Sequence, residues 1–321
     1  MKLMVKLSIL FLMFVNACYS IHSNKEFKMK KEDKTILITG ATKGLGLATA
    51  KHLAQKGYKV YGTFRKTSRL EFLDQAIKEC SGNLLKLELD VTDEKSISEG
   101  IKKVISESGK IDVLINNACE VVIGTVETCS IEEQMHEMNV NYFGVVRMLQ
   151  AILPHMREQN QGHIINISSI SAAISVPHIE SYAATKHALE GLSDSLEVYL
   201  SKWNIKVTVI EPGPIKTDVA FDSSLGSRWT QETKCFKKYC ERAHQMMQDG
   251  YESYQPPEEI AFLIENIIED ENPHYRYLTN DFFREKVEEY FKEITGNERL
   301  QKAKRDFSDN FDDFFDLIKE K

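Results

Sequence analysis

Residues 35–46 read Thr-Ile-Leu-Ile-Thr-Gly-Ala-Thr-Lys-Gly-Leu-Gly, and this stretch decides the fold. An apolar run of strand length ends before Gly40, and apolar residues recur at helical spacing after Gly44. Glycines between a strand and a helix allow a tight turn, and they leave the unpaired N–H groups of the helix open to an anionic group such as a dinucleotide's pyrophosphate. The stretch therefore predicts a phosphate-binding strand–turn–helix unit.

The rest of the chain alternates short apolar runs with helical patterns, which is typical of a parallel sheet covered by helices on both faces. Strands are expected at residues 35–39, 59–64, 84–90, 112–116, 163–167 and 206–211. Helices are expected at residues 44–56, 68–80, 93–106, 131–157 and 181–202, and another is expected to begin at Pro256-Pro257. The pattern predicts an α/β fold with a doubly wound parallel sheet of six strands.

The segment of residues 221–255 interrupts this alternation. It mixes aromatic residues and methionines with charged residues, and it follows the sixth strand, where doubly wound folds bind their ligands. The large apolar side chains in it are Trp229, Phe236, Tyr239, Met246 and Met247. We interpret residues 220–256 as a helical substrate lid, with an ordinary surface insertion as the alternative. The tail of residues 296–321 also has a helical pattern and is expected to pack on the edge of the domain.

The N-terminus differs in kind from the rest of the chain. Lys2 and Lys6 precede the apolar residues 7–15, and small residues follow near Ala17, which is typical of a secretory signal peptide or a short membrane anchor. The apolar run is shorter than the ~20 residues that span a bilayer. Residues 1–21 are therefore interpreted as a signal peptide or anchor, and residues 22–34 as a linker. This predicts a membrane-associated or exported protein, with a soluble cytoplasmic protein as the alternative.

Composition narrows the classes of partner. The 321 residues carry a formal net charge of −7, which disfavours a nucleic-acid surface because such a surface needs a basic stripe. The six cysteines form no paired CxxC elements and lack the accompanying histidine spacing of a zinc site. No metal site is predicted, and the cysteines are expected to be free thiols.

A second cluster of residues carries chemistry. Ser169, Tyr182 and Lys186 supply a hydroxyl, a phenol and an ammonium, and Tyr182 and Lys186 lie one helical turn apart on one face. A close ammonium is expected to lower the phenol pKa from its usual value near 10. Tyr182 could then act as general acid when a carbonyl is reduced, or as general base when an alcohol is oxidised. Ser169 could hydrogen-bond to the reacting oxygen. With the glycine turn, the cluster predicts a hydride-transferring oxidoreductase.

Cations after the second strand indicate which dinucleotide binds. Arg65 and Lys66 follow that strand, no carboxylate appears until Glu71, and Lys43 lies inside the glycine turn. A ribose 2′-hydroxyl favours a carboxylate at this place, whereas a 2′-phosphate favours cations. We predict NADP(H) rather than NAD(H), with Arg65 and Lys43 at the phosphate. Asp90 is expected to accept from the adenine amino group, or alternatively to cap a helix.

These motifs together resemble the short-chain dehydrogenase/reductase family over about residues 35–285. They occur in the family's order: the glycine turn, Asn116-Asn-Ala118, Asn141, Ser169, Tyr182-x-x-x-Lys186 and Pro212-Gly213. The resemblance implies a single Rossmann-fold domain over residues 35–295 and a catalytic tetrad of Asn141, Ser169, Tyr182 and Lys186. In that tetrad Asn141 is expected to hold a water that links Lys186 to solvent, while Lys186 also holds the nicotinamide ribose.

The resemblance also implies which residues line the cofactor. They are Gly40, Thr42, Lys43, Gly44, Leu45, Gly46, Arg65, Asp90, Val91, Asn117, Tyr182, Lys186, Pro212, Gly213, Ile215 and Thr217. The family further implies a homodimer formed through the helices that carry Asn141 and Tyr182. One position departs from the family pattern, because Cys119 stands where the Asn-Asn-Ala-Gly motif has glycine. Its thiol is expected to crowd the ribose or to narrow the substrate pocket.

Three later runs of sequence look like the 17β-hydroxysteroid and retinol dehydrogenase branch of the family. They are Glu211-Pro-Gly-Pro-Ile-Lys-Thr217, Pro257-Glu-Glu-Ile-Ala261 and Pro273-His-Tyr-Arg-Tyr-Leu-Thr279. They favour a lipophilic alcohol or ketone, of steroid, retinoid or other lipid type, as substrate. The expected pocket wall includes Val122, Ile123, Val176 and His178, although His178 is better explained as a surface residue of a loop. A 3-oxoacyl thioester reductase and a non-catalytic NADP(H)-binding regulatory protein are the alternative functions.

Overall fold

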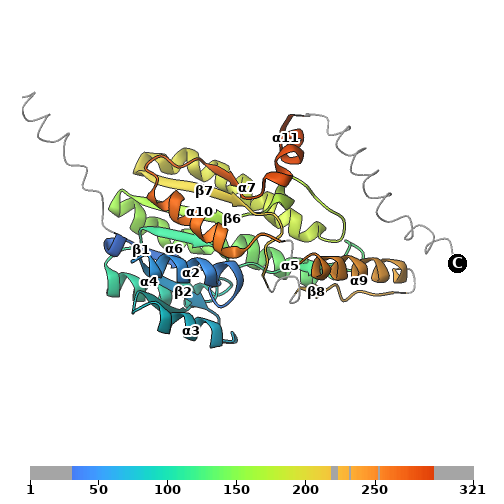
Figure 1. The fold of residues 1–321 in the computed structure, drawn as a ribbon, viewed down its shortest axis with the longest axis horizontal. Helices are drawn as coiled ribbons and strands as arrows, with labels where there is room; N and C mark the ends of the chain where they lie inside the picture. The colour runs from blue at the N-terminus through green and yellow to red at the C-terminus, as the bar shows by residue number, and fades with distance from the viewer. Residues whose placement is uncertain (1–30, 218–222, 231–232, 252–253, 293–321) are drawn as a thin grey trace, which may run out of the picture.

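The computed structural model describes residues 31–217, 223–230, 233–251 and 254–292. Within them, seven parallel strands form one sheet in the order β3-β2-β1-β4-β6-β7-β9, with helices on both faces (Figure 1). The strands are β1 (Thr35–Ile38), β2 (Lys59–Phe64), β3 (Leu84–Glu88), β4 (Val113–Asn116), β6 (Gly162–Ile167), β7 (Ile205–Glu211) and β9 (Arg276–Leu278). The predicted single-domain, doubly wound α/β fold is confirmed, and the strand order reverses between β1 and β4.

Two apolar cores flank the sheet. One face is covered by α2 (Gly44–Gln55), α3 (Glu71–Glu79) and α10 (Pro257–Glu269), and the other by α4 (Glu94–Ser108), α6 (Gly144–Gln159) and α7 (Glu180–Leu200). The central strands alternate between the two cores: Leu37 packs with α4 and α6, whereas Ile36 and Ile38 pack with α2 and α10. Burial on both faces explains why β1 and β4 read as continuous apolar runs.

The helix predicted over residues 131–157 is interrupted in the structure. It divides into α5 (Ile131–Met138), a π-helical turn at Asn139–Phe143 and α6. Ser130 begins α5 with a capping box, since its hydroxyl accepts from the Glu133 N–H while the Glu133 carboxylate accepts from the Ser130 N–H. The wide turn is centred on Asn141, a residue of the predicted tetrad. Such π-turns distort the backbone hydrogen-bond ladder and are common at functional sites.

The prediction of six strands was one short, because β9 pairs with β7 at the edge of the sheet. This strand has only three residues, all half-buried, and therefore carries no apolar run that the sequence could reveal. An ion-pair cluster fixes it instead. The Arg276 guanidinium contacts Glu211 at the end of β7 and lies 2.8 Å from Glu190 Oε2 on α7.

The predicted lid segment contains a helix. In it, α9 (Lys234–Asp249) lies beside a small two-stranded sheet of β5 (Val122–Ile123) and β8 (Ser224–Leu225), at one end of the molecule (Figure 1). Tyr239 and Cys240 of α9 are buried against Ile123 of β5. This third apolar cluster fastens the lid segment to the chain that follows β4.

The two ends of the chain fall mostly outside the described residues. These include the predicted signal or anchor of residues 1–21 and the tail of residues 296–321. Among the residues that are described, no helix is both long and apolar enough to cross a bilayer. The last residues of the predicted linker are tied to the domain, since the Lys31 ammonium lies 2.9 Å from Glu265 Oε1 of α10.

Candidate active site

The glycine turn after β1 forms a cradle into which side chains do not fit. Gly40 and Gly44 have φ of 68° and 56°, a left-handed backbone that favours glycine. A Cβ on Gly46 would lie 2.3 Å from the Gly40 carbonyl oxygen. The side chain of Lys43, the N-cap residue of α2, makes no capping hydrogen bond to the helix. The turn therefore fits the pyrophosphate of a dinucleotide, which would accept from the first N–H groups of α2.

Two polar residues hold this turn in place. The Thr39 hydroxyl accepts from the N–H groups of Asn117 and Ala118 at 2.9 and 3.0 Å. The Asn117 amide group donates to the carbonyl oxygens of Thr39 and Gly40 at 2.9 and 3.1 Å. Both amide hydrogens of Asn117 are thus used within the protein, so its side chain supports the turn from behind. Thr39, which directly precedes the glycines, was not among the predicted site residues.

The predicted phosphate-binding cations, Arg65 and Lys43, follow the carboxyl ends of the parallel strands β2 and β1. Arg65 follows β2, and Lys43 is exposed at the start of α2. Arg65 Nη1 lies 2.8 Å from Glu120 Oε1, an ion pair that the sequence did not reveal.

Asp90, which follows β3, does not cap the next helix. The Asp90 carboxylate accepts from the N–H and the hydroxyl of Thr92 at 2.8 and 2.7 Å. The cap of α4 is Asp93, which accepts from the N–H groups of Lys95 and Ser96. The alternative that Asp90 caps this helix is therefore wrong.

Two predicted cofactor contacts point into the cores. Leu45 and Val91 are each only 7 % exposed and pack in the two apolar clusters that flank the sheet. Only their backbones can face a dinucleotide. Thr42, Gly213 and Ile215 are half-buried, and Thr217 is 3.3 Å from where a Cβ on Gly44 would lie. Pro212 is buried, and its carbonyl accepts from the Ile170 N–H at 3.1 Å.

The structure brings Ser169, Tyr182 and Lys186 together beyond the end of β6. Ser169 is buried, its hydroxyl accepts from the Ser171 N–H at 3.1 Å, and the same hydroxyl lies beside the Tyr182 phenol. Lys186 is 3 % exposed, and its ammonium lies 5.5 Å from the centre of the Tyr182 ring. The two residues share one face of α7, as predicted. A hydroxyl, a phenol and an ammonium therefore meet where a carbonyl oxygen could lie.

The expected effect of Lys186 on the Tyr182 pKa is not found. Burial raises the Tyr182 pKa well above its ordinary value near 10, and the neighbouring Cys119 and Glu137 add to this rise, whereas the Ser169 hydrogen bond lowers it. The Lys186 ammonium instead donates to the Ile167 carbonyl at 2.8 Å. The expectation of a lowered phenol pKa is therefore corrected, because desolvation outweighs attraction to a cation that is held elsewhere.

Asn141 is buried at the π-turn, and its amide is fully engaged. Its Oδ1 accepts from the Glu120 N–H at 2.9 Å, while its Nδ2 donates to the Glu120 carbonyl at 2.9 Å and to the Thr185 hydroxyl at 3.2 Å. Thr185 belongs to α7, one residue before Lys186. Asn141 thus joins the chain after β4 to the helix that carries Tyr182.

Two further residues lie close to the Tyr182 phenol: Cys119, whose contact with Tyr182 was not predicted, and Glu137, which was not among the predicted site residues. The Cys119 thiol, at the position where the family motif has glycine, lies beside both Tyr182 and Lys186. Glu137 of α5 has no exposed surface, and its Oε1 accepts from the Val122 N–H at 3.1 Å. Burial raises the Glu137 pKa, which favours the neutral carboxylic acid.

The predicted pocket wall lies where the lid meets the loop before α7. Ile123 is buried against α9, Val122 is half-buried and Val176 is exposed. His178 is not the surface residue that was expected. Its Nδ1 lies 3.0 Å from the Tyr239 hydroxyl of α9, and burial lowers its pKa to about 4. His178 therefore connects the lid helix to the loop that leads to Tyr182.

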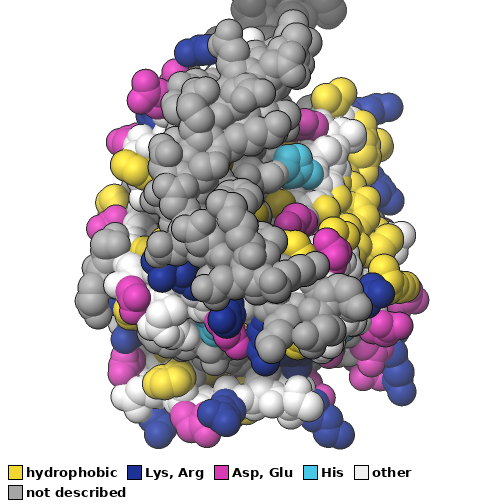
Figure 2. Space-filling view, turned by 90° about the vertical axis from the view of Figure 1, so that its right-hand side faces the viewer, with side chains coloured by type: hydrophobic (Ala, Val, Ile, Leu, Met, Phe, Trp, Pro, Cys, Tyr) yellow, Lys and Arg dark blue, Asp and Glu magenta, His cyan; other side chains and the backbone are white. Residues whose placement is uncertain are grey.

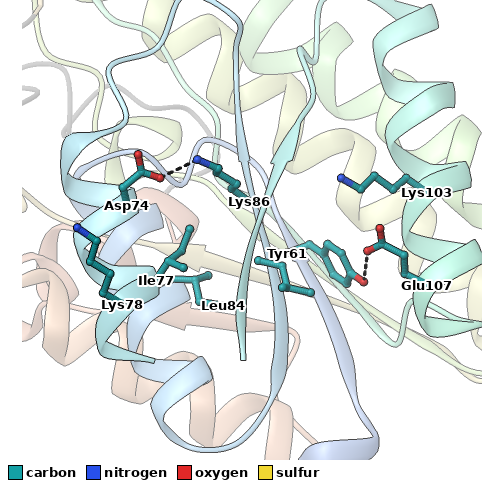
Figure 3. Close-up of a pocket in the computed structure, with 9 residues that line it drawn as sticks. Tyr61, Asp74, Ile77, Lys78, Leu84, Lys86, Lys103 and Glu107 are labelled. Atoms are coloured by element: carbon teal, nitrogen blue, oxygen red, sulfur yellow. Dashed lines mark hydrogen bonds and ion pairs between the residues drawn. The ribbon is translucent and has the colours of Figure 1, made fainter. Parts of the chain in front are cut away.

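A separate cavity of about 540 Å³ lies beside the edge strand β3, between α3 and α4 (Figure 3). Its wall includes Lys86 of the edge strand β3, paired with Asp74 at 2.8 Å, and Tyr61, which donates to Glu107 at 2.9 Å. None of the predicted tetrad or cofactor residues lines it. Lys86 is a charged side chain on an edge strand, where charge discourages pairing with other chains.

Comparison with known proteins agrees with this geometry. The model of the short chain dehydrogenase family matches residues 34–226. The chain is 35% identical over 245 residues to 3-ketodihydrosphingosine reductase of Bacteroides thetaiotaomicron, covering 76% of this chain and 87% of that protein. It is 37% identical over 194 residues to human retinol dehydrogenase 8, covering 59% and 61% of the two chains. It is 33% identical over 258 residues to human 17-beta-hydroxysteroid dehydrogenase type 1, covering 77% and 78%.

Solved structures give the same result. A short-chain dehydrogenase from Streptomyces avermitilis superposes with a TM-score of 0.71 at 29% identity, covering 84% of this chain and 97% of that one. An alcohol dehydrogenase from Thermococcus sibiricus, complexed with 5-hydroxy-NADP, superposes with a TM-score of 0.61 at 25% identity, covering 76% and 95%. The chain belongs to the short-chain dehydrogenase family of nicotinamide-dependent oxidoreductases.

Proposed function

We propose that the protein interconverts a lipophilic alcohol and its carbonyl compound by hydride transfer with NADP(H). The observation that carries this proposal is that Ser169, Tyr182 and Lys186 meet beyond the carboxyl end of β6. The glycine turn that precedes α2 lies at the same end of the parallel sheet. When bound, the nicotinamide supplies the hydride for reduction or accepts it in oxidation.

The roles of the tetrad follow from its contacts. Tyr182 donates the phenolic proton to the carbonyl oxygen in reduction, and in the reverse direction it accepts the alcohol proton. Ser169 donates a hydrogen bond to the same oxygen and stabilises its developing negative charge. The Lys186 ammonium, which donates to the Ile167 carbonyl, would hold the nicotinamide ribose. The Asn141 side-chain amide is already hydrogen-bonded within the protein. The water that resupplies protons would therefore bind to the Asn141 backbone carbonyl, which lies in the π-turn.

The preference for NADP(H) rests on Arg65 and Lys43. Both cations lie at the edge of the sheet where a dinucleotide would extend from the glycine turn, and the guanidinium of Arg65 suits a phosphate geometrically. Dissociation constants for NADPH and NADH test this preference directly. Tighter binding of NADH than of NADPH would contradict it.

The lipophilic substrate is supported by the third apolar cluster. Trp229, Phe236 and Met247 of the lid segment pack with Ile123 and Ile179 near the end of β4 and the start of α7. A wall of aromatic and aliphatic side chains suits an apolar ligand. Relatives named for retinol, a 17β-hydroxysteroid and a 3-keto lipid support the same class.

A 3-oxoacyl thioester reductase is the second candidate, because a relative is named for reduction of a 3-keto compound. Oxidation of NADPH should be screened against steroid ketones, retinal, a 3-keto sphingoid base and acetoacetyl thioesters. Turnover of the lipid-like ketones at higher kcat/KM than the thioesters is the expected result. Turnover confined to thioesters would favour the second candidate, and no turnover with any of them would favour a non-catalytic NADP(H)-binding protein.

We further propose a homodimer formed through α5, α6 and α7. The exposed apolar side chains on and between these helices are Ile131, Met135, Phe143, Val198 and Tyr199. Figure 2 faces the end of the molecule where α5 and α9 lie, and it shows apolar side chains gathered along one margin. Light scattering should report a dimer for the wild type and a monomer for Val198→Asp.

The N-terminal residues 1–21 are proposed to target the protein to a membrane or an export pathway, on the basis of their charge and apolar pattern. Residues 1–30 fused to a reporter should bring it into the membrane or secreted fraction. A reporter that stays soluble and uncleaved would contradict both forms of this proposal.

A further inference from the structure

Glu120 connects three parts of the site that are far apart in the sequence. It directly follows the Asn-Asn-Ala-Cys motif at the end of β4, and its carboxylate contacts a guanidinium and an imidazole. Glu120 Oε1 lies 2.8 Å from Arg65 Nη1 at the end of β2, and Glu120 Oε2 lies 2.8 Å from His136 Nε2 on α5. The Glu120 side chain is 31 % exposed, so solvent or a ligand can reach it.

The backbone of Glu120 is held by a buried side chain, whereas its carboxylate contacts exposed side chains. Its N–H and its C=O both bond to the Asn141 amide at 2.9 Å. A residue fixed by two backbone hydrogen bonds to a buried side chain cannot shift as a whole without breaking both. The carboxylate, in contrast, contacts Arg65 and His136, whose side chains are 49 % and 56 % exposed. The Arg65 pair can therefore be exchanged for another partner while His136 keeps hold of Glu120.

Arg65 is one of the two cations to which the proposed function assigns the 2′-phosphate, and the following step rests on that assignment. A phosphate must compete with a carboxylate that is already paired with the guanidinium, and the two like charges repel each other. An uncharged ribose 2′-hydroxyl meets no such penalty, and it can donate to a carboxylate. We infer that Glu120 is a specificity-determining residue, which weakens NADP(H) binding through Arg65 and so narrows the preference for NADP(H) over NAD(H).

The size of the effect is limited by exposure. Ion pairs between exposed side chains change binding or stability by about 0.2–1 kcal/mol, which corresponds to about 1.5- to 5-fold in an equilibrium constant. Glu120 should therefore tune the preference rather than reverse it. Removing its charge while keeping its shape, in Glu120→Gln, should strengthen NADPH binding by about two- to fivefold. NADH binding should stay unchanged or weaken.

A double-mutant cycle tests the inference on the full chain. Dissociation constants for NADPH and NADH would be measured by titration calorimetry for the wild type, Glu120→Gln, Arg65→Ala and the double variant. Glu127→Gln is the matched control, because Glu127 is an exposed carboxylate in the same stretch that the structure does not place against Arg65. The tightening of NADPH binding should appear in Glu120→Gln, vanish when Arg65 is absent, and be missing from the control.

The outcomes separate this inference from the proposed function. An unchanged NADPH to NADH affinity ratio in Glu120→Gln, or a tightening that persists without Arg65, overturns the role of Glu120. The wild-type ratio alone decides the NADP(H) preference. A wild type that prefers NADH would overturn the proposed cofactor, whereas the change in ratio on Glu120→Gln would still report whether Glu120 acts through Arg65.

Discussion

The Lys186 ammonium donates a 2.8 Å hydrogen bond to the carbonyl oxygen of Ile167, the last residue of β6. This bond joins α7 to the strand that leads directly to Ser169. It places the helix that carries Tyr182 against the residue with which Tyr182 is proposed to share a substrate oxygen. Because both groups of the bond are buried, its loss leaves a polar atom without compensation from water.

Lys186→Met should therefore lower stability as well as turnover. The free energy of unfolding should fall by about 1–3 kcal/mol, the usual cost of an unsatisfied buried polar group, and turnover should fall steeply. Lys59→Met is the matched control, since the Lys59 ammonium also donates to a backbone carbonyl, at 3.1 Å, but at an exposed position. Urea unfolding should show a much smaller loss for Lys59→Met. Equal losses would mean that burial of the Lys186 bond contributes nothing.

Gly46→Ala should abolish cofactor binding. Its Cβ would lie 2.3 Å from the Gly40 carbonyl oxygen and 2.5 Å from Asn117 Nδ2, so the phosphate turn must open. Gly191→Ala is the control, because a Cβ there meets nothing within 4 Å and alanine favours the helix by about 1 kcal/mol. Thermal unfolding and NADPH titration should show a less stable, non-binding Gly46→Ala and a slightly stabilised, binding Gly191→Ala. Normal NADPH affinity in Gly46→Ala would refute the cradle.

The raised Tyr182 pKa predicts opposite pH profiles for the two directions of the reaction. Reduction needs the neutral phenol, and a pKa above the ordinary value near 10 keeps the phenol neutral throughout the range from about pH 6 to pH 9. The kcat/KM for reduction should therefore stay flat over that range. Oxidation needs the phenolate, and its kcat/KM should rise by about tenfold per pH unit over that range. A fall in reduction near pH 7, matched by a plateau in oxidation, would instead show a lowered phenol pKa.

Tyr239→Phe should weaken substrate binding without affecting the cofactor. The change removes the hydroxyl that lies 3.0 Å from His178 Nδ1 but keeps the ring that packs in the apolar cluster. Loss of this hydrogen bond should hold the lid helix less firmly and raise KM for a lipophilic ketone by about three- to tenfold, which corresponds to the free energy of one buried hydrogen bond. The Kd for NADPH should stay unchanged. An unchanged KM would separate α9 from the substrate pocket.

The sequence predicted the fold well where both faces of a strand are buried. Continuous apolar runs fixed β1, β2, β4, β6 and β7 to within a residue or so of their observed ends. It failed where tertiary contacts hold the backbone. β9 depends on Arg276 reaching Glu211 and Glu190 from distant parts of the chain, and no local pattern encodes such a cluster.

The meeting of Ser169, Tyr182 and Lys186 was more predictable than the contacts that each of them makes. Spacing identified Ser169, Tyr182 and Lys186 because they share a helix face or end a strand. It could not show that Lys186 donates to Ile167, that desolvation raises the Tyr182 pKa, or that Glu120 pairs with Arg65, since each depends on burial and on residues far away in the sequence. Glu120 did carry a local signal, being a charged residue directly after the Asn-Asn-Ala-Cys motif.

Turnover of Tyr182→Phe, measured with NADPH and the best ketone found in the substrate screen, tests the central claim most directly. The variant keeps the ring above Lys186 and loses only the hydroxyl, so it should fold and bind NADPH like the wild type while kcat falls by about 10²–10⁴-fold or more. Tyr199→Phe, at a tyrosine that is 49% exposed on α7, should keep full activity. Tyr182→Phe turnover above a few per cent of wild type would contradict the role of Tyr182 as the proton carrier.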